Sequence, residues 1–430
     1  MEALPPSHAP KKETIAILGA GVTGLQSALS ILSSPSLFPK PHVIVIAQHL
    51  PGDENIEYTS PWAGGHWRSH AHSSPEEAEI RDWDARTYRE WRRLLEAAGV
   101  DEAGMRTAGP KSEAEEMGEG KAEGRTKEGM QKLEKHLGLG IRESVMYWSE
   151  ETDETSRPDG SGLWWRDVVT GFRVLSKEEL ADASRASGTK EGEGQAEAKI
   201  LFGARYDTIC INVPRYLSYL TERITALGGE LTCATVRTDG GLEGVVEDVR
   251  RVVAARSPGG LEMEALVLAT GLLSAHFLPP SEASLLYPVR GQTVLVKGEA
   301  PRAVTHLFPG GDIGYVIPRP GSGTTILGGC KEKGNWEEGE DKGVTERILG
   351  RGRGLVPELL VGGNEKGEGE FEVLGVQIGR RPGRKGGPRV EVEKERVKGV
   401  RVIYAYGHEG AGYQNSVGSA EKVARLLAEG

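Results

Sequence analysis

The chain has 430 residues, of which 37% are hydrophobic and 27% charged, so it can bury a sizeable core in two or three domains. Its formal net charge of −10, without a basic tract, argues against nucleic acid and anionic membranes as partners. No apolar run approaches the roughly 18 residues of a membrane-spanning helix, and the polar N-terminus lacks the apolar segment of a signal peptide. Three cysteines indicate a reducing compartment and leave open whether Cys210 and Cys233 pair.

A βαβ unit is predicted at the start of the chain. Thr14 to Leu18 is typical of a buried strand, Leu25 to Leu32 has apolar residues at helical spacing, and His42 to Ala47 is a second apolar strand. Glycines separate the first strand from the helix in the pattern G-x-G-x-x-G. In a dinucleotide-binding turn these glycines allow a tight bend, a close approach of pyrophosphate to the backbone, and close packing of the helix. The alternative is a structural glycine turn. The predicted cofactor contacts are Gly19, Ala20, Gly21, Val22, Thr23 and Gly24.

The end of the second strand departs from the usual dinucleotide pattern. It reads Ala47-Gln48-His49, where an acidic residue normally binds the ribose hydroxyls. Gln48 can hydrogen-bond a ribose, so we expect it to take that place.

The middle of the chain alternates ordinary elements with charged segments. A helix is predicted over Asp82 to Leu95, with Trp83, Tyr88 and Trp91 on one side. Two segments rich in Gly, Glu, Lys and Ala, near 108–127 and 184–198, are interpreted as solvated insertions or disordered loops.

Later elements complete the predicted sheet and its helices. Tyr206 to Leu227 is interpreted as a turn leading into a helix, and Leu231 to Val236 as a strand. Leu266 to Ala269 is a buried strand that ends in Thr270-Gly271. A last strand over Val402 to Ala405 leads through a second glycine turn to a helix over Ser416 to Leu427. Two such turns, one at each end of the chain, favour FAD bound along its length over NAD alone.

Five segments resemble the D-amino-acid oxidase family, in the order of that family. They are Thr59 to Trp67, Tyr287 to Thr293, Gly314 to Pro320, Ile378 to Arg384 and Tyr406 to Gly418. The resemblance implies an α/β fold in which an FAD-binding Rossmann-like domain is interleaved with a mixed-sheet substrate domain. The expected FAD domain is discontinuous, over residues 13–75, 205–275 and 400–430, and the substrate domain covers 76–204 and 276–399.

The resemblance also implies further cofactor contacts outside the first glycine turn. With Gln48, they are Thr59, Ser60, Gly64, Gly65, Trp67, Val236, Ala269, Thr270, Gly271, Gly410, Ala411, Gly412, Tyr413 and Gln414.

Members of this family move the Cα hydrogen of a D-amino acid to the flavin as hydride, and oxygen then yields hydrogen peroxide. Positioning and electrostatics are therefore the tasks of the protein. The resemblance places the arginine that grips the α-carboxylate at Arg381, the tyrosine that caps it at Tyr315, and a residue near the substrate amine at Gln414. Arg380 and Arg384 are competitors interpreted as solvated or structural, and a half-buried strand tyrosine is the alternative for Tyr315.

Lys331 bears on the substrate class. At this place the family's oxidases of neutral substrates carry an aromatic residue, and its D-aspartate oxidases carry an arginine that pairs with the side-chain carboxylate. A lysine keeps the charge without the fork, so we expect acidic D-amino acids, D-aspartate first, with a further donor from His66. If Lys331 instead points to solvent beside Lys333, neutral D-amino acids are the substrates. An NAD(P)-linked dehydrogenase and a flavin-binding protein without turnover also remain open.

Other partners and the location are less well marked. His66, His70 and His72 lie close in sequence, but no carboxylate or cysteine cluster accompanies them, so no metal site is predicted. Cys330 is expected to be a small core residue near the pocket. The expected partners are a D-amino acid and O2, and a homodimer is left open. Family members usually carry a C-terminal peroxisomal tripeptide, but this chain ends in Leu-Ala-Glu-Gly, so we expect a peroxisomal or a cytosolic location.

Overall fold

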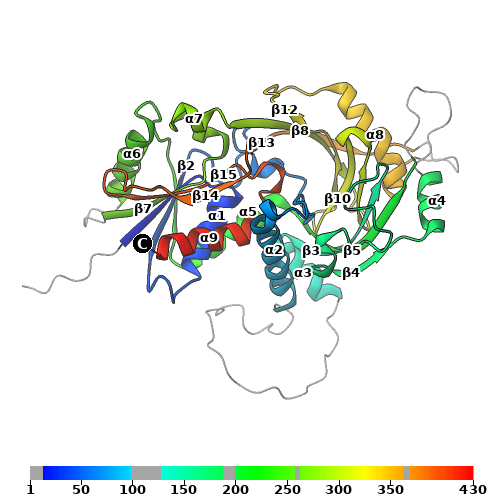
Figure 1. Ribbon diagram of the computed structural model, residues 1–430, viewed down its shortest axis with the longest axis horizontal. Helices are drawn as coiled ribbons and strands as arrows, with labels where there is room; N and C mark the ends of the chain where they lie inside the picture. The colour runs from blue at the N-terminus through cyan, green and yellow to red at the C-terminus, as the bar shows by residue number, and fades with distance from the viewer. Residues whose placement is uncertain (1–12, 98–126, 187–198, 257–261, 363–368, 430) are drawn as a thin grey trace, which may run out of the picture.

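A computed structural model describes residues 13–97, 127–186, 199–256, 262–362 and 369–429. Its strands form two sheets, which lie side by side in Figure 1, sheet A on the left and sheet B on the right. Both sheets mix parallel and antiparallel pairs, and helices cover them. The predicted α/β class with mixed sheets is confirmed.

Sheet A is built around the predicted βαβ unit. Its strands run in parallel except for the edge strand β14, which is antiparallel to β15. Ile15 and Ile17 pack on one face of β1 and Ala16 and Leu18 on the other, as the period of a strand requires. In spatial order the strands are β14 (Arg389–Val392), β15 (Arg401–Tyr406), β7 (Glu262–Leu268), β1 (Glu13–Leu18), β2 (His42–Ala47) and β6 (Glu230–Cys233).

Helices lie on both faces of sheet A. One face carries α1 (Val22–Leu32), which packs against α9 (Ser416–Ala428) and α5 (Val213–Ala226), and the other carries α6 (Gly241–Arg256). The long helix α2 (Ala78–Ala97) packs against α9 and buries the three aromatic residues predicted on one side of it. The short helix α7 (Pro280–Ala283) leads into sheet B.

Sheet B is longer and mostly antiparallel, with one parallel pair between β3 and β9. Helix α8 (Lys342–Leu355) packs on one of its faces, and β13 (Val373–Arg384) pairs with β8 along its length. Two further helices, α3 (Lys127–Leu137) and α4 (Lys177–Ala186), flank it. The strand order is β12 (Glu332–Lys333), β8 (Leu286–Lys297), β11 (Thr324–Gly328), β10 (Ile313–Arg319), β9 (Ala303–Leu307), β3 (Leu139–Trp148), β5 (Phe202–Ile211) and β4 (Thr170–Val174).

Strand β5 corrects one sequence interpretation. Tyr206 to Ile211 continues a strand paired with β3, and the helix that follows starts only at Val213. The β-branched residues of this segment favour a strand, and Arg205 and Asp207 are tolerated because they alternate with buried side chains.

The expected division at 205 and 399 also differs from sheet membership. Strand β5 belongs to sheet B, whereas β14 belongs to sheet A. The chain therefore crosses between the sheets at other points than the family resemblance implied.

The two charged segments fall mainly outside the described residues. Residues 108–126 and 187–198 are not described, whereas Lys127 begins α3 and Ser184 to Ala186 end α4. None of the described helices combines the length and the apolar character needed to cross a bilayer. Cys210, Cys233 and Cys330 are free thiols, and Cys210 and Cys330 are buried, the latter as predicted.

Candidate functional site

A cavity lies where the carboxyl ends of the parallel strands of sheet A meet sheet B. It is bordered by the turns that follow β1, β2, β7 and β15, by strands β8, β10 and β13 of sheet B, and by the segment 57–70. In open α/β sheets ligands bind at the carboxyl ends of the strands. We call the part formed by residues 19–23, 47–49 and 269–271 the glycine end. The part formed by Arg68, His70, Tyr315, Lys331 and Arg381 is called the cationic end.

The glycine end is made by close approaches of backbone. Gly19 has φ of 113°, and a Cβ there would lie 2.4 Å from the carbonyl oxygen of Ala269. A Cβ at Gly24 would lie 1.9 Å from the carbonyl oxygen of Gly19, so helix α1 could not pack at this depth with any other residue. These two positions therefore require glycine for the reason that the sequence pattern suggested.

The N-terminus of α1 opens onto this end of the cavity. Its first turn contains no acidic residue, and its N-cap, Gly21, makes no side-chain hydrogen bond. The Ser60 hydroxyl accepts a hydrogen bond from the Val22 amide at 3.0 Å, and a Cβ at Gly21 would meet the same hydroxyl. A helix N-terminus with free amides and a glycine turn is suited to a diphosphate.

Buried polar atoms without a partner also mark this cavity as a polar ligand site. Among the residues described, His66 Nε2, Thr293 Oγ1, His408 Nε2 and Gln414 Nε2 border the cavity, are buried and have no hydrogen-bond partner. Such atoms are uncommon in proteins, since each costs free energy when it is left unpaired. The glycine cradle and these donors and acceptors fit a long, polar dinucleotide such as FAD.

Most of the residues expected to contact cofactor do border the cavity. Gly24 and Ala411 do not, and Gly24 instead serves the packing of α1 described above. The bordering residues are Gly19, Ala20, Gly21, Val22, Thr23, Gln48, Thr59, Ser60, Gly64, Gly65, Val236, Ala269, Thr270, Gly271, Gly410, Gly412, Tyr413 and Gln414.

Trp67 is not at the cavity, contrary to expectation. It is fully buried in the core, where its indole nitrogen donates to the carbonyl of Asp84. Residues 66–67 run alongside β5, so successive side chains point to opposite sides. Trp67 therefore faces the core, whereas Arg68, its neighbour in sequence, borders the cavity.

Arg381 and Tyr315 meet at the cationic end. Arg381 Nη1 donates to the carbonyl oxygens of Cys330 (3.2 Å) and Arg290 (3.4 Å). A Cβ at Gly291 would lie 2.4 Å from both terminal nitrogens of Arg381, so the guanidinium rests on bare backbone. Burial raises the pKa of Tyr315, and the positive charges of Arg381 and Arg68 oppose that rise. The tyrosine therefore stays a hydroxyl beside a guanidinium, an arrangement that suits a carboxylate.

Glycines also shape the place of Tyr315. A Cβ at Gly328 would lie 2.1 Å from Tyr315 Cζ, and one at Gly329 would lie 2.6 Å from the Tyr315 hydroxyl oxygen. The ring thus lies over two residues without side chains, on the strand that pairs with its own.

Lys331 borders the same end of the cavity, as the acidic-substrate prediction requires. Its side chain is exposed by surface area, yet the surrounding protein still limits the hydration of its ammonium group. This partial burial, followed by the charges of Arg68 and Arg381, lowers the pKa of Lys331 to about 8, and the carboxylate of Glu409 opposes the shift. Lys333 lies instead over the ring of Tyr287, 4.2 Å from its centroid.

The two histidines of this end are neutral at physiological pH. Burial, with the charge of Arg68, lowers the pKa of His66 to about 3. Burial lowers the pKa of His70 well below its ordinary value, and Arg68 and Lys331 add to the effect. His66 can therefore offer the predicted hydrogen-bond donor, but neither ring adds positive charge. In the described part of the chain no three His, Cys, Asp or Glu side chains gather as a metal site.

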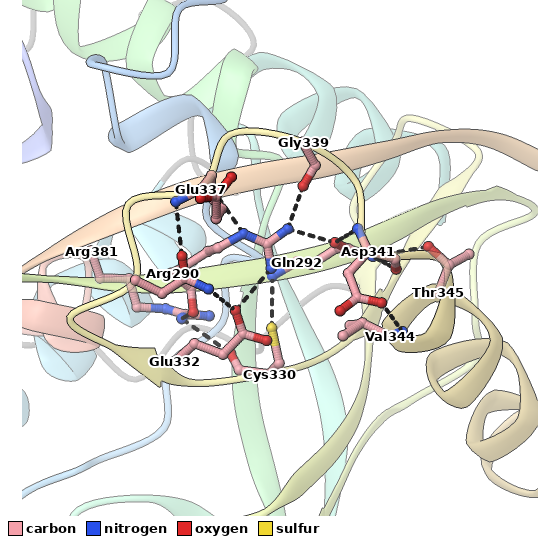
Figure 2. A network of polar contacts seen from close by, with 11 residues as sticks. Arg290, Gln292, Cys330, Glu332, Glu337, Gly339, Asp341, Val344, Thr345 and Arg381 are labelled. Atoms are coloured by element: carbon pink, nitrogen blue, oxygen red, sulfur yellow. Dashed lines mark hydrogen bonds and ion pairs between the residues drawn. The ribbon is translucent and has the colours of Figure 1, made fainter.

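A buried arginine holds the loop that carries Lys331 (Figure 2). Arg290 is 2% exposed and pairs with Glu332 at 3.0 Å (Nη1 to Oε2), one residue beyond Lys331. It also donates to the carbonyls of Glu337 and Gly339 and to the side-chain oxygen of Gln292, and the backbone N–H of Gln292 in turn donates to Cys330 Sγ. The loop is thereby fixed at both sides of Lys331, and the Arg290 carbonyl helps to hold Arg381.

Sequence reasoning did not find Arg68 and Glu409, and it weighed His70 only as a metal ligand. Both Arg68 and His70 border the cavity next to residues that it did find. The alternation of side chains along an extended segment could have indicated both, since residues 66, 68 and 70 lie on one side of it. Glu409 has a positive φ of 49° within the second glycine turn, and only its place in the fold brings it near Lys331.

The chain matches the family model described as FAD dependent oxidoreductase over residues 14–426. It is 29% identical to a D-amino-acid oxidase of Fusarium vanettenii, which covers 96% of both chains, and 30% identical to one of Schizosaccharomyces pombe (95% of this chain, 94% of that one). A D-aspartate oxidase of Talaromyces thermophilus is 28% identical over 96% of this chain and 94% of its own. The resemblance stated from the sequence motifs is confirmed.

Solved structures share the fold at lower identity. The glycine oxidase of Geobacillus kaustophilus is similar with a TM-score of 0.60 and 20% identity, over 97% of this chain and 95% of that one. At this identity the likeness concerns the fold, which includes the arrangement of two sheets around the cavity.

Proposed function

Because this chain belongs to the FAD-dependent oxidoreductase family, we propose that it oxidatively deaminates acidic D-amino acids. D-Aspartate is the leading substrate and D-glutamate the second. The products are the 2-oxo acid, ammonia and hydrogen peroxide. The relatives named D-amino-acid oxidase and D-aspartate oxidase support the reaction, and the charges of the cavity support the choice of acidic substrates.

The observation that carries the substrate class is the convergence of three cationic side chains. Arg68, Lys331 and Arg381 border one end of a single cavity, and the charges of Arg68 and Arg381 both act on Lys331. Like charges held together in a partly buried site are unfavourable unless an anion joins them. A neutral amino acid brings one carboxylate, which Arg381 can bind, whereas an acidic one brings two.

The residues divide the work of binding as follows. Arg381, resting on Gly291, offers its guanidinium to the α-carboxylate, and the Tyr315 hydroxyl donates a second hydrogen bond to it. Gln414 is 3% exposed and its amide nitrogen has no partner among the described residues, so its carbonyl and amide can orient the substrate amine. When bound, FAD supplies the acceptor of the Cα hydrogen and is reoxidised by O2.

The charge of the cavity also favours the reactive form of the substrate. The Cα hydrogen leaves as hydride most readily when the amine carries a free electron pair. Three nearby cations disfavour a further positive charge, so they lower the pKa of a bound ammonium, and the neutral rings of His66 and His70 supply no negative charge to offset this. The site therefore needs no strong general base.

Neutral D-amino acids are the second candidate. The observation that favours them is the carboxylate of Glu409, which offsets part of the charge of Lys331. If Glu409 neutralises Lys331 in the holoenzyme, the cavity has less need of a second substrate carboxylate.

Oxygen consumption by the purified holoenzyme tests the proposal. Rates are measured with D-aspartate, D-glutamate, D-asparagine, D-alanine and, as the stereochemical control, L-aspartate. We expect kcat/KM for D-aspartate to exceed that for D-alanine and D-asparagine by at least about tenfold, because a desolvated charge pair is worth several kcal/mol. A higher value for D-alanine than for D-aspartate would establish the second candidate instead.

A further inference from the structure

We propose that Arg68, held by His70, binds the side-chain carboxylate of the substrate, and that Lys331 has only an accessory role in this recognition. The proposal rests on the proposed function and assigns its substrate selectivity to a residue that the sequence motifs did not indicate.

Arg68 lies on the cavity side of an extended segment. Residues 66, 68 and 70 border the cavity, while Trp67 and Ser69 point the other way and bond Asp84 on α2. The segment is anchored to β5 by the Trp67 amide, which donates to the Ile209 carbonyl at 2.8 Å. The backbone of Arg68 is thus fixed by the anchored residues on either side of it. Trp67 and Ser69 point toward the core, whereas the side chain of Arg68 points toward the cavity.

Arg68 lacks an anionic partner among the residues that the structure describes. The charged and titratable groups that act on it are Tyr206, Tyr315, Arg381, Lys331 and its hydrogen-bond partner His70, none of which is a carboxylate. Arg290 is the contrasting case, since its guanidinium is saturated by Glu332, a side-chain amide and two carbonyls (Figure 2). Arg384 likewise pairs with Glu282 at 2.7 Å between Nε and Oε1. Arg68 is half-buried, and a partly desolvated guanidinium without a counter-ion is costly, so an external anion is the partner that Arg68 is suited to receive.

His70 fixes Arg68 without neutralising it. Arg68 Nη2 lies 2.7 Å from His70 Nε2, and because a guanidinium can only donate, Nε2 must accept and the ring proton must reside on Nδ1. A carboxylate in place of this imidazole would hold the guanidinium equally well but would cancel its charge. The neutral ring therefore orients the fork and leaves the charge available.

His70 also places this fork close to the α-carboxylate site. A Cβ at Gly410 would lie 3.2 Å from His70 Cε1 and 3.6 Å from Arg381 Cδ, so the two side chains flank the same glycine. The charge of Arg381 acts on both Arg68 and His70. Two guanidinium groups separated by one imidazole suit the two carboxylates of a short dicarboxylic amino acid.

Lys331 is the weaker candidate for the same task. It offers a point charge rather than a planar fork, and Glu409 already acts on it as a counter-charge. Its reduced pKa of about 8 means that it loses its proton in the range where Arg68 keeps its own. Lys331 therefore strengthens the field of the cavity but is not the specific partner.

The test uses D-aspartate and D-asparagine, which differ only in a carboxylate and an amide of the same shape. Selectivity is the ratio of their kcat/KM values, measured on the FAD-loaded wild type, Arg68→Gln, Arg68→Lys, His70→Phe and Lys331→Met. Arg380→Gln is the matched control, because Arg380 pairs with Glu338 and does not border the cavity. FAD content and thermal unfolding are recorded for each variant.

We expect Arg68→Gln to lower the selectivity about 100-fold, mainly by raising KM for D-aspartate, while kcat/KM for D-asparagine falls far less, through the lost charge near the substrate amine alone. Arg68→Lys should recover part of the loss, since it keeps the charge without the fork. His70→Phe should give a smaller loss, Lys331→Met a loss below about tenfold, and Arg380→Gln none.

Three results would overturn the assignment. Selectivity that survives Arg68→Gln but collapses in Lys331→Met would transfer the role to Lys331 and leave the proposed function intact. Equal loss of both substrates in Arg68→Gln and Arg68→Lys, with FAD retained, would make Arg68 part of the α-carboxylate site or of the fold. A wild type with no preference for D-aspartate over D-asparagine would instead remove the proposed function, and this assignment with it.

Discussion

The glycine end of the cavity is shaped mainly by closely packed backbone, whereas the cationic end is shaped mainly by charged side chains. At the glycine end, backbone approaches backbone so closely that Gly19 and Gly24 admit no side chain. At the cationic end, side chains from β10, β13, the loop after β11 and the segment 64–70 converge, and charge decides what can bind. The first end is centred on a short glycine motif that packs against Ala269, whereas the second has no such motif and joins residues up to 313 positions apart, from Arg68 to Arg381.

The largest effect should come from a side chain at the glycine end. In Gly24→Val the new Cβ would fall 1.9 Å from the carbonyl oxygen of Gly19, so α1 must move away from the turn. We expect protein without bound FAD and a free energy of unfolding lower by about 3 kcal/mol or more. The flavin absorption of the purified protein and a urea titration measure the two effects.

Gly244→Ala in α6 is the control for this substitution. A Cβ there meets no atom within 4 Å, and alanine favours a helix by about 1 kcal/mol over glycine. FAD binding that survives Gly24→Val would contradict the account of the glycine end.

At the cationic end, Arg381→Gln should abolish turnover while leaving FAD in place. The change removes the fork that holds the α-carboxylate, so kcat/KM should fall by about 100- to 10,000-fold for acidic and neutral D-amino acids alike. Gly291→Ala is a more specific test, because it displaces the Arg381 guanidinium without removing its charge. We expect this variant to lose part of the same kcat/KM. Steady-state oxygen uptake measures both. A loss confined to acidic substrates would show that Arg381 binds the side chain instead.

The loop behind the cationic end can be loosened through Arg290. Arg290→Gln leaves Glu332 and two carbonyls without their partner, so unfolding should require about 3 kcal/mol less free energy. Arg302→Gln is the control, since the pair of Arg302 and Glu358 is largely exposed and is worth about 0–1 kcal/mol. Urea unfolding compares the two variants. Equal stability of both would mean that the network in Figure 2 does not hold the loop.

The last prediction concerns Asp84, which joins the segment that carries Arg68 to helix α9. It accepts hydrogen bonds from Ser69, beside Arg68, and from Asn415, at the start of α9. Burial raises the pKa of Asp84 from 3.8 to about 8, and the two hydrogen bonds oppose the shift. Between these values the folded protein binds more protons than the unfolded chain, so this carboxyl makes stability fall as pH rises from about 4 to 8.

Asp84→Asn removes this titration. Relative to the wild type, the variant should gain stability between pH 5 and 8, by at most about 1.4 kcal/mol per pH unit. Urea unfolding of both proteins across this range provides the comparison. Parallel curves would mean that Asp84 keeps an ordinary pKa in the folded state.

The same contrast explains what the sequence could predict. The turn from Gly19 to Gly24 was predictable because its glycines form a short motif, although the steric reason for Gly19 is the distant carbonyl of Ala269. The family resemblance predicted Arg381, Tyr315 and Lys331, because no motif near them in sequence indicates that they lie together. Arg68 was not predicted, because its position at the cavity follows from the side of the extended segment that it shares with His66 and His70. Trp67, which lies between them in sequence, was assigned to the cofactor although it faces the core.

If the cavity of this FAD-dependent enzyme binds a dicarboxylic D-amino acid, as we propose, D-aspartate and D-asparagine must differ in how they reduce the flavin. The most direct test mixes the oxidised holoenzyme anaerobically with D-aspartate or D-asparagine and follows the loss of flavin absorption in a stopped-flow instrument. We expect rapid loss at low D-aspartate concentration, and loss with D-asparagine only at concentrations at least about tenfold higher. Equal concentration dependence for the two substrates, or faster reduction by D-asparagine, would contradict it.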